Sequence, residues 1–268
     1  MKSKTSAKLG IVIPLKSKLV SKNWEVTCEN LKTTLLSVEA QSCQNFRCVV
    51  VGHELPNFFS EINLSSEFFK FNELSPPIIG EDESDNQIKY ETDRCTKILS
   101  GIKNINENYH DISHWFALDA DDLIHRDFVK IFHKYKDYDG IVLDRGYFYF
   151  KNTGIVNKEN CFSAYCGSSS IISSKLFSIP QKITKESFRE IPFGKVSHVN
   201  MKKYLEKNNY NVAIPDEFLV MYVRDNGENI SNAAYCNTWD RKLKKIIKMI
   251  IRMNINSFKI KREFISYY

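Results

Sequence analysis

Hydrophobic residues form short continuous runs along the first half of the chain. Runs rich in β-branched and aromatic residues occupy 9–15 (LGIVIPL), 46–54 (FRCVVVGHE) and 68–74 (FFKFNEL), and another occupies 114–119. Continuous apolar runs of this length are typical of strands that are buried on both faces of a sheet. The pattern therefore predicts buried strands at 9–15, 46–54 and 114–119, and 68–74 could be a further strand.

Between these runs, apolar residues recur at the spacing of a helix. Residues 24–41 and 93–105 each present one apolar face at this spacing, and Ser21 and Asn23 could cap the first of these helices. Residues 75–87 are rich in proline and acids, which predicts a loop. The order strand, helix, strand implies a parallel sheet with a right-handed crossover.

The second half of the chain alternates in the same way. The predicted elements are helices at 127–136 and 198–210, strands at 140–150 and 218–224, and a small-residue loop within 161–177. The chain contains no internal repeat. The simplest division is one α/β domain with a mostly parallel central sheet over 1–237, followed by a tail over 238–268.

Positive charge is concentrated at the C-terminus. The formal net charge is +6, whereas residues 239–268 contain nine Lys or Arg and two acids, a net +7, so the other 238 residues sum to −1. A domain that binds nucleic acid has a basic face of its own. The charge distribution therefore argues against nucleic acid as a partner.

The cysteines and the N-terminus bear on the compartment. The seven cysteines are odd in number and have no CxxC spacing, which favours reduced, buried side chains over disulfides. The first apolar run is too short for a signal peptide, and no stretch has the length of a membrane span. We therefore expect a cytoplasmic protein, or one held at a membrane surface.

Three carboxylates end the run at 114–119, in the sequence WFALDADDLI. They belong to Asp119, Asp121 and Asp122. Like charges this close repel one another, and a desolvated carboxylate is costly unless it is paired. Ligands of open parallel sheets bind beyond the carboxyl ends of strands, and Mg²⁺ or Mn²⁺ would relieve the repulsion through oxygen ligands. The alternative is a solvated strand end with a helix-capping aspartate.

Two enzyme classes place an Asp-x-Asp pair after a buried strand. In haloacid-dehalogenase phosphatases the first aspartate is the nucleophile, but the motif lies on an early strand and a small residue usually follows, where this chain has Leu123. In nucleotide-sugar glycosyltransferases with the GT-A fold, the motif ends a nucleotide-binding βαβ half. The layout here resembles the second class, specifically bacterial GT-A glycosyltransferases related to family 2, over most of residues 8–235.

The resemblance rests on short pieces that occur in the same order. They are IVIPLK, VVVGHELP, DRCTK, DADDL, DRGYFYF, CGSSSIIS and YVRDNGENIS. One turn departs from the pattern, because family 2 enzymes usually carry Asp-Asp-Gly-Ser after the second strand and this chain has Gly52-His53-Glu54. The resemblance implies a GT-A-like fold, in which a Rossmann-type nucleotide-binding half is continuous with an acceptor half.

The resemblance also implies a reaction. A sugar would pass from a nucleotide-sugar donor to a glycan or lipid-linked acceptor, with inversion, in the synthesis of a surface polysaccharide or glycolipid. The nucleoside diphosphate that leaves needs a Lewis acid. Asp121 is the first metal ligand that the resemblance implies and Asp119 the second, with ribose or base contacts also expected for Asp119. Asp225 is the third, with Glu228 as its alternative, whereas Asp122 is expected to brace the loop.

The donor nucleotide is expected over the ends of the first two strands. Pro14 and Lys16 end the first strand, and Glu54 at the end of the second could accept a hydrogen bond from uracil or guanine. Lys97 could reach a phosphate, with Asp93 near the base. Alternatively, Lys97 is a solvated helix lysine and Asp93 a first-turn acid that suits the helix dipole.

An inverting transferase needs a base for the acceptor hydroxyl. In resembling enzymes an acid precedes the helix that follows the acceptor loop, and the candidates in this region are Glu186, Glu190 and His198. His198 lies at a predicted helix start, and histidine titrates in the useful range. Residues 166–171 (CGSSSI) are expected to floor the acceptor site, because small residues allow close approach. A structural histidine and a plain turn are the alternatives.

The C-terminal tail has the pattern of a basic amphipathic helix over 238–262. Its apolar side is Leu243, Ile246, Ile247, Ile250 and Met253, and its basic side is Arg241, Lys244, Lys245, Lys248 and Arg252. Such a helix could lie in an anionic membrane surface beside a lipid-borne acceptor. The alternative is a terminal helix that packs on the body with its lysines in water.

Two other functions are compatible with these residues. A phosphatase would use Asp119 as its nucleophile and would need no nucleotide. A degenerate GT-A domain would act as a membrane-bound scaffold or lectin, which the missing Asp-Asp-Gly-Ser turn and the lack of a late histidine allow. The intact Asp119 and Asp121 count against this last function.

Overall fold

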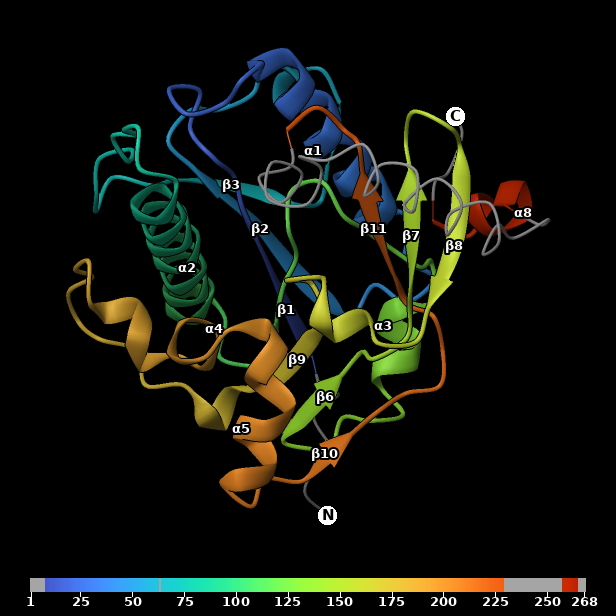
Figure 1. Ribbon diagram of the computed structural model, residues 1–268. Helices are drawn as coiled ribbons and strands as arrows, with labels where there is room; N and C mark the ends of the chain where they lie inside the picture. The colour runs from blue at the N-terminus through green and yellow to red at the C-terminus, as the bar shows by residue number, and fades with distance from the viewer. Residues whose placement is uncertain (1–7, 63, 229–256, 265–268) are drawn as a thin grey trace.

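The computed structural model describes residues 8–62, 64–228 and 257–264. The four strands predicted in the first half pair in parallel, in the order β4-β1-β2-β3 (Figure 1). Their bounds are Lys8–Pro14 for β1, Phe46–Gly52 for β2, Glu67–Lys70 for β3 and Ile112–Ala117 for β4. This confirms the predicted parallel arrangement.

Three short strands complete the central sheet beyond β4. They are β6 (Gly140–Val142), β9 (Ser170–Ser173) and β10 (Val212–Ala213). β9 runs antiparallel to both β4 and β6, whereas β10 is parallel to β6. The protein is therefore an α/β fold with a mostly parallel central sheet, as predicted.

A second sheet has the strand order β5-β11-β7-β8. Its strands are β5 (Leu123–Ile124), β7 (Gly146–Phe150), β8 (Ile155–Glu159) and β11 (Val220–Arg224). The prediction of one strand over 140–150 is wrong, because β6 pairs with β9 in the central sheet and β7 pairs with β8 and β11 in this one. The chain crosses between the sheets at Asp144 and Arg145, the two polar residues that interrupt the apolar run.

The two long helices cover opposite faces of the central sheet. Helix α1 (Trp24–Glu39) packs against the side of β1 that carries Ile11 and Ile13, and helix α2 (Glu83–Asn108) packs against the side that carries Val12. The predicted cap is present on α1, where the Asn23 side chain accepts a hydrogen bond from Val26 N. These helices enclose the two largest parts of the core.

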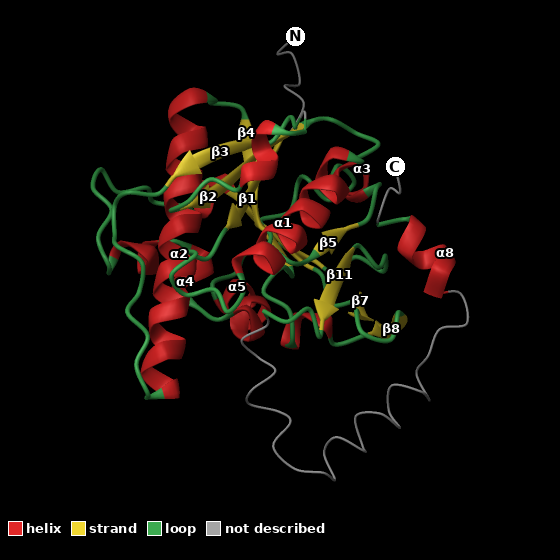
Figure 2. Cartoon of the chain, turned by 90° about the horizontal axis from the view of Figure 1, so that it is seen from above, coloured by secondary structure: helices red, strands yellow, loops and turns green. Residues whose placement is uncertain are grey.

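Helix α2 begins ten residues earlier than the prediction of 93–105, so the predicted loop over 75–87 is wrong in its second half. The reason is an N-cap at Asp82, whose side chain accepts hydrogen bonds from Ser84 N and Asp85 N. The helix has 26 residues, a length of about 39 Å. Its first turns extend past the carboxyl edge of the sheet and so flank any ligand that binds there (Figure 2).

The remaining helices of the body are short. They are α3 (Phe128–Phe132), α4 (Pro192–Lys195) and α5 (Met201–Lys207), with 3₁₀ turns at Asn57–Ser60 (η1), Phe162–Ala164 (η2), Ser174–Leu176 (η3), Ser187–Glu190 (η4) and His198–Asn200 (η5). The helices predicted at 127–136 and 198–210 are therefore present but shorter than expected. Residues 198–200 form a separate 3₁₀ turn before α5.

The end of the predicted tail packs on the body. Helix α8 (Ser257–Arg262) lies beside β8, and Phe264, which is 2% exposed, joins a small core with Met221 and Val223 of the second sheet. Arg126 N also donates to Glu263 O at 2.9 Å. The other residues of the predicted amphipathic helix, 238–256, lie outside the described residues.

The cysteines in the described part of the chain are all free thiols. Cys48, Cys95 and Cys166 are buried, as expected. Cys161 is exposed and Cys28 and Cys43 are half-buried, so the expectation of burial is wrong for these three. No helix in the same residues is long and apolar enough to cross a membrane.

Candidate active site

The acid cluster lies just beyond the carboxyl end of β4. Asp119 Oδ1 accepts a hydrogen bond from Arg94 Nε of α2 at 2.7 Å. Gly167 lies against this pair, where a Cβ atom would approach Asp119 Oδ2 to 2.5 Å and Arg94 Nη2 to 2.8 Å. The small-residue loop before β9 therefore leaves room for the ion pair that anchors Asp119.

Of the three acids in the cluster, Asp122 is buried, whereas Asp119 and Asp121 are partly buried. Burial, and then the charge of Asp119, raise the pKa of Asp121 to about 6. Asp122 Oδ2 accepts hydrogen bonds from Ser168 Oγ at 2.7 Å and Cys166 Sγ at 3.1 Å. Asp122 thus ties the loop after β4 to the loop before β9, whereas Asp121 stays closer to the open side.

The late loop reaches the cluster through Asn226. Asn226 Nδ2 donates to Asp121 Oδ2 at 2.7 Å, and its Oδ1 accepts from Glu228 N at 2.9 Å. In the described part of the chain, no three His, Cys, Asp or Glu side chains form a group that could hold a metal ion. The predicted ligand set of Asp119, Asp121 and Asp225 is therefore not gathered, and the contact from the late loop is an amide.

Glu228, the alternative third ligand, instead binds the loop after β1. Its carboxylate forms an ion pair with Lys16 and accepts from Lys22 N at 3.2 Å and Asn23 N at 2.6 Å. Lys16 Nζ also donates to Glu228 O at 3.0 Å. Lys16 is therefore linked to Asp121 through Glu228 and Asn226.

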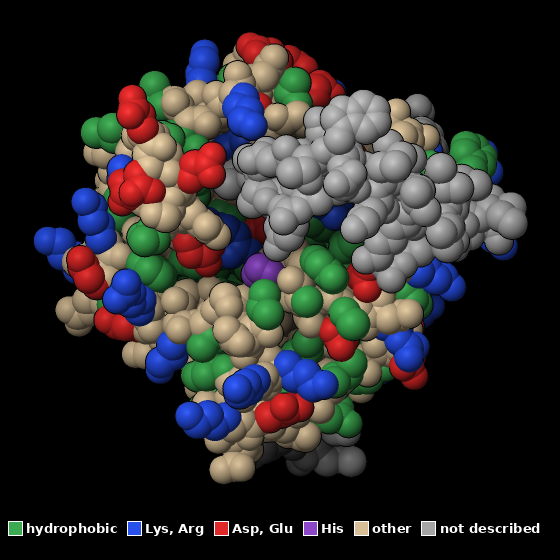
Figure 3. Space-filling model, viewed as in Figure 1, with side chains coloured by type: hydrophobic (Ala, Val, Ile, Leu, Met, Phe, Trp, Pro, Cys, Tyr) green, Lys and Arg blue, Asp and Glu red, His purple; other side chains and the backbone are tan. Residues whose placement is uncertain are grey.

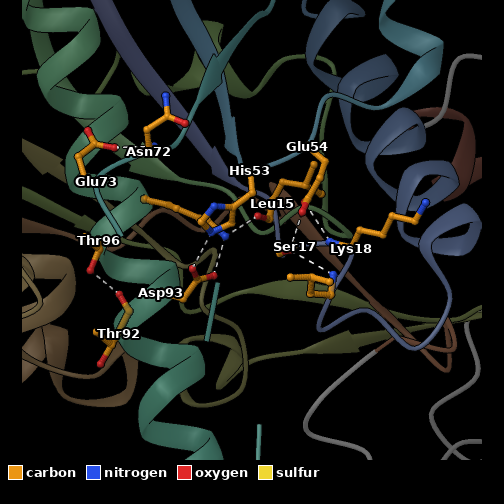
Figure 4. Close-up of polar contacts among 12 residues, drawn as sticks. Leu15, Ser17, Lys18, His53, Glu54, Asn72, Glu73, Thr92, Asp93 and Thr96 are labelled. Atoms are coloured by element: carbon orange, nitrogen blue, oxygen red, sulfur yellow. Dashed lines mark hydrogen bonds and ion pairs between the residues drawn. The ribbon is translucent and has the colours of Figure 1, made fainter. Parts of the chain in front are cut away.

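A second group of charges lies under the ends of β1 and β2 (Figure 4). Lys97 is fully buried, and its Nζ donates to Leu15 O at 2.8 Å and to Asp93 Oδ2 at 2.6 Å. Burial lowers the pKa of Lys97. His53 Nε2 lies 3.5 Å from the other oxygen of Asp93. Neither the predicted phosphate contact nor the solvated alternative is correct for Lys97, because its ammonium faces inward.

Glu54 closes this group on the side of the β1 loop (Figure 4). Its carboxylate accepts from Ser17 Oγ at 2.8 Å and from Lys18 N at 3.0 Å. The structure therefore places Pro14, Lys16 and Glu54 together at the ends of β1 and β2, where the donor nucleotide is expected. Glu54 orders the loop that carries Lys16.

Of the three candidate bases, His198 is the one that is partly buried, in the turn η5, which lies against η2. Burial, and then the charge of Arg94, lower the pKa of His198, while Asp119 and Glu91 act in the opposite direction. Glu186 and Glu190 are exposed, and Glu186 accepts from Thr184 Oγ1 at 3.0 Å. On the face shown in Figure 3, acidic, basic and histidine side chains meet around a hollow near the centre.

Sequence reasoning missed two residues of this site. Arg94 belongs to the DRCTK piece and pairs with Asp119. The available signal was a basic residue on the helix that comes just before a strand ending in acids. Asn226 lies between the two acids considered in the late loop, but its contact with Asp121 joins residues 105 apart in the chain. A local pattern carries no signal for such a pair.

Comparisons with known proteins give a weak likeness. No protein-family model and no curated protein matches the chain. Similar solved structures include two of TarS from S. aureus, one of them of residues 1–349, with TM-scores of 0.43 and 0.44 and 15% identity. Each covers 81% of this chain, which spans 60% and 36% of the two TarS chains. A likeness of this size does not extend to function.

Proposed function

We propose that this chain is a glycosyltransferase that moves a sugar from a nucleotide-sugar donor to a glycan or lipid-linked acceptor. The observation that carries the proposal is the hydrogen-bonded connection from Lys16 through Glu228 and Asn226 to Asp121, which joins the loop after β1 to the acid cluster after β4. An ammonium and two carboxylates in one place suit a diphosphate that is bound together with a divalent cation.

The residues present fit Mg²⁺ or Mn²⁺. Burial, and then the charge of Asp119, raise the pKa of Asp121, and a bound cation would favour its ionised form. Mg²⁺ is usually held by one or two carboxylates together with substrate phosphates and water, so a third acid is not required. Asp121 and Asp119 would hold the ion. When bound, the ion would act as a Lewis acid toward the leaving diphosphate.

The protein side chains have separate tasks in this proposal. Lys16 binds the diphosphate and Glu54 lies toward the base, whereas Asp93 pairs with Lys97 and His53 in the buried group. The acceptor oxygen bonds to the anomeric carbon as the bond to the diphosphate breaks, and the imidazole of His198 takes the hydroxyl proton. The lowered pKa of His198 keeps its ring neutral near pH 7, as a base must be. Arg94 holds Asp119 in place.

The proposed acceptor chemistry and location follow from the C-terminal residues. We propose that the basic segment within 238–262 holds the enzyme on the inner face of a membrane, in surface polysaccharide or glycolipid synthesis. Helix α8 supports this, because Phe258 is 59% exposed and Lys259 and Arg262 are also exposed. Sedimentation with anionic vesicles at low salt tests it against a variant with glutamine at Arg241, Lys244, Lys245, Lys248 and Arg252. Equal pelleting of the two proteins would contradict the membrane role.

Calorimetry with a panel of UDP-, GDP- and CMP-sugars tests the proposed function. We expect one donor to bind in Mn²⁺ and to lose most of its affinity in excess EDTA or in Asp121→Asn. The matched control is Asp216→Asn, since the Asp216 side chain is 86% exposed and pairs with Arg145. Release of phosphate from a phosphomonoester without nucleotide-sugar binding would favour the phosphatase. If the protein neither binds a nucleotide-sugar nor releases phosphate, the result would favour a scaffold.

A further inference from the structure

Glu228 is a buried carboxylate in the middle of the proposed donor site. It is 6% exposed, and its partners are Lys16 Nζ and the backbone N–H groups of Lys22 and Asn23. A buried carboxylate is tolerated only when such partners compensate for its lost hydration. All of these donors belong to the loop after β1, which is the loop expected to receive an anionic ligand.

The turn over 225–228, which contains Glu228, also reaches the acid cluster. Glu228 N donates to Asn226 Oδ1, and Asn226 Nδ2 donates to Asp121. The turn over 225–228 therefore provides a carboxylate to the ammonium of the site and an amide donor to its carboxylate. These are the two groups that a diphosphate and its cation would use, so the turn satisfies both of them in the absence of a ligand.

The backbone of the turn depends on these contacts. Asp225 has φ 57° and Gly227 has φ 87°, both in the left-handed region. Glycine adopts this region freely, and aspartate is among the non-glycine residues that adopt it most often. The hydrogen bonds of Asn226 and Glu228 fix the position of this turn.

We propose that Glu228 competes with the diphosphate of the donor for Lys16, so that binding of a nucleoside diphosphate displaces the turn over 225–228. This inference rests on the proposed function of the site. A diphosphate carries more negative charge than one carboxylate and takes over the ammonium of Lys16. When Lys16 leaves, the carboxylate of Glu228 loses the one charged partner that it has among the described residues, and the turn is released from Asp121 together with it.

Competition of this kind lowers the apparent affinity for nucleotide. Only the fraction of molecules with the turn displaced is competent to bind, so weakening the turn strengthens binding. The Glu228→Gln variant keeps the shape of the side chain but removes the charge that holds Lys16. We expect it to bind UDP or GDP about tenfold more tightly than the unchanged protein, within the limit that the population of the closed turn sets.

The experiment is a cycle of variants of the full chain, measured by calorimetry with UDP, GDP and inorganic pyrophosphate. It compares the unchanged protein, Glu228→Gln, Lys16→Met and the double variant. The gain from Glu228→Gln should disappear when Lys16 is methionine, because the carboxylate then has no ammonium to withhold. Glu217→Gln, which removes an ion pair with Lys134 away from the site, is the matched control and should change nothing.

A second variant covers the case in which Glu228→Gln does not fold. A Cβ atom at Gly227 would meet only Val26 Cγ1 at 3.6 Å, so Gly227→Ala strains the turn through its positive φ without a clash. It should also tighten nucleotide binding, and only when Lys16 is present.

The outcomes distinguish a failure of the competition from a failure of the proposed function. Weaker or unchanged binding in both variants, or a gain that persists in Lys16→Met, overturns the competition and leaves the proposed function standing. Absence of nucleotide binding in the unchanged protein and in every variant overturns the proposed function and the competition with it.

Discussion

Two clusters of charge lie at the same edge of the central sheet, and they differ in how far apart in the chain the paired residues are. In the buried cluster, Lys97 pairs with Asp93 one helical turn away and is fully buried. In the open cluster, Lys16 pairs with Glu228, 212 residues later, and its side chain is 23% exposed. The buried cluster fixes the end of β1, whereas the lysine of the open cluster can exchange its partner for a ligand.

The largest expected effect is a loss of turnover when His198 is replaced. His198→Ala should lower kcat by roughly 10²–10⁴ and leave both donor binding and the free energy of unfolding nearly unchanged, because His198 is proposed only to take a proton. Steady-state kinetics and thermal unfolding measure this. His110→Ala, at an exposed position after α2, is the control. Normal turnover in His198→Ala would remove this residue from the mechanism and leave Glu190 and Glu186 to be tested in its place.

Exchanging the two lysines for methionine tests the comparison directly. Lys97→Met leaves the buried carboxylate of Asp93 without its ammonium, so the free energy of unfolding should fall by about 3 kcal/mol, with nucleotide affinity retained in the folded fraction. Lys16→Met should instead weaken nucleotide binding and cost less stability than Lys97→Met, because Lys16 is partly exposed and Glu228 keeps the N–H donors of Lys22 and Asn23. Urea unfolding and calorimetry measure the two effects. Equal losses of stability would erase the distinction between the clusters.

The acid beside Lys16 is expected to act on cation binding. Asp121→Ala removes one of two carboxylate ligands, so the Kd for Mn²⁺ should rise by at least about tenfold, or 1.4 kcal/mol. Titration with Mn²⁺ in the presence of nucleotide measures the change. Asp93→Asn is a useful contrast because Asp93 belongs to the buried cluster and should affect stability first. An unchanged Kd in Asp121→Ala would place the cation elsewhere.

The smallest effect concerns a buried group away from both clusters. His114 is 3% exposed with Nε2 2.9 Å from Tyr138 O, and burial lowers its pKa below the usual 6.5. The unfolded chain therefore takes up the proton first. Stability from His114 is complete above pH 6.5 and falls as the pH drops toward the lowered pKa, by at most about 1.4 kcal/mol per pH unit. Urea unfolding of His114→Asn between pH 5 and 7 should show a shallower slope, and an unchanged slope would contradict this.

Local patterns predicted the parallel half of the fold because its signals are local. The runs that became β1, β2 and β4 are buried on both faces, and a continuous apolar run is a direct record of such burial. The cap at Asn23 is likewise a short-range signal. The start of α2 was missed because proline and acids suggested a loop, although Asp82 supplied a helix cap within the same stretch.

The parts of the site that sequence could not predict depend on long-range contacts. The three acids at the end of β4 were found because they are adjacent, but the inward direction of Lys97 is decided by Leu15 O across the sheet edge. The choice of Asn226 over Asp225 depends on a turn with two left-handed residues. No spacing rule states which of three neighbouring polar residues will face a distant carboxylate.

The packing of Phe264 into the second sheet has a consequence for the attachment of α8. Phe264 is 2% exposed in a small core with Met221 and Val223, and Arg126 N donates to Glu263 O beside it. Truncating this aromatic ring to alanine should cost about 3 kcal/mol. Phe264 is thus an anchor for α8, and its loss should loosen α8 from β8 before it affects the central sheet.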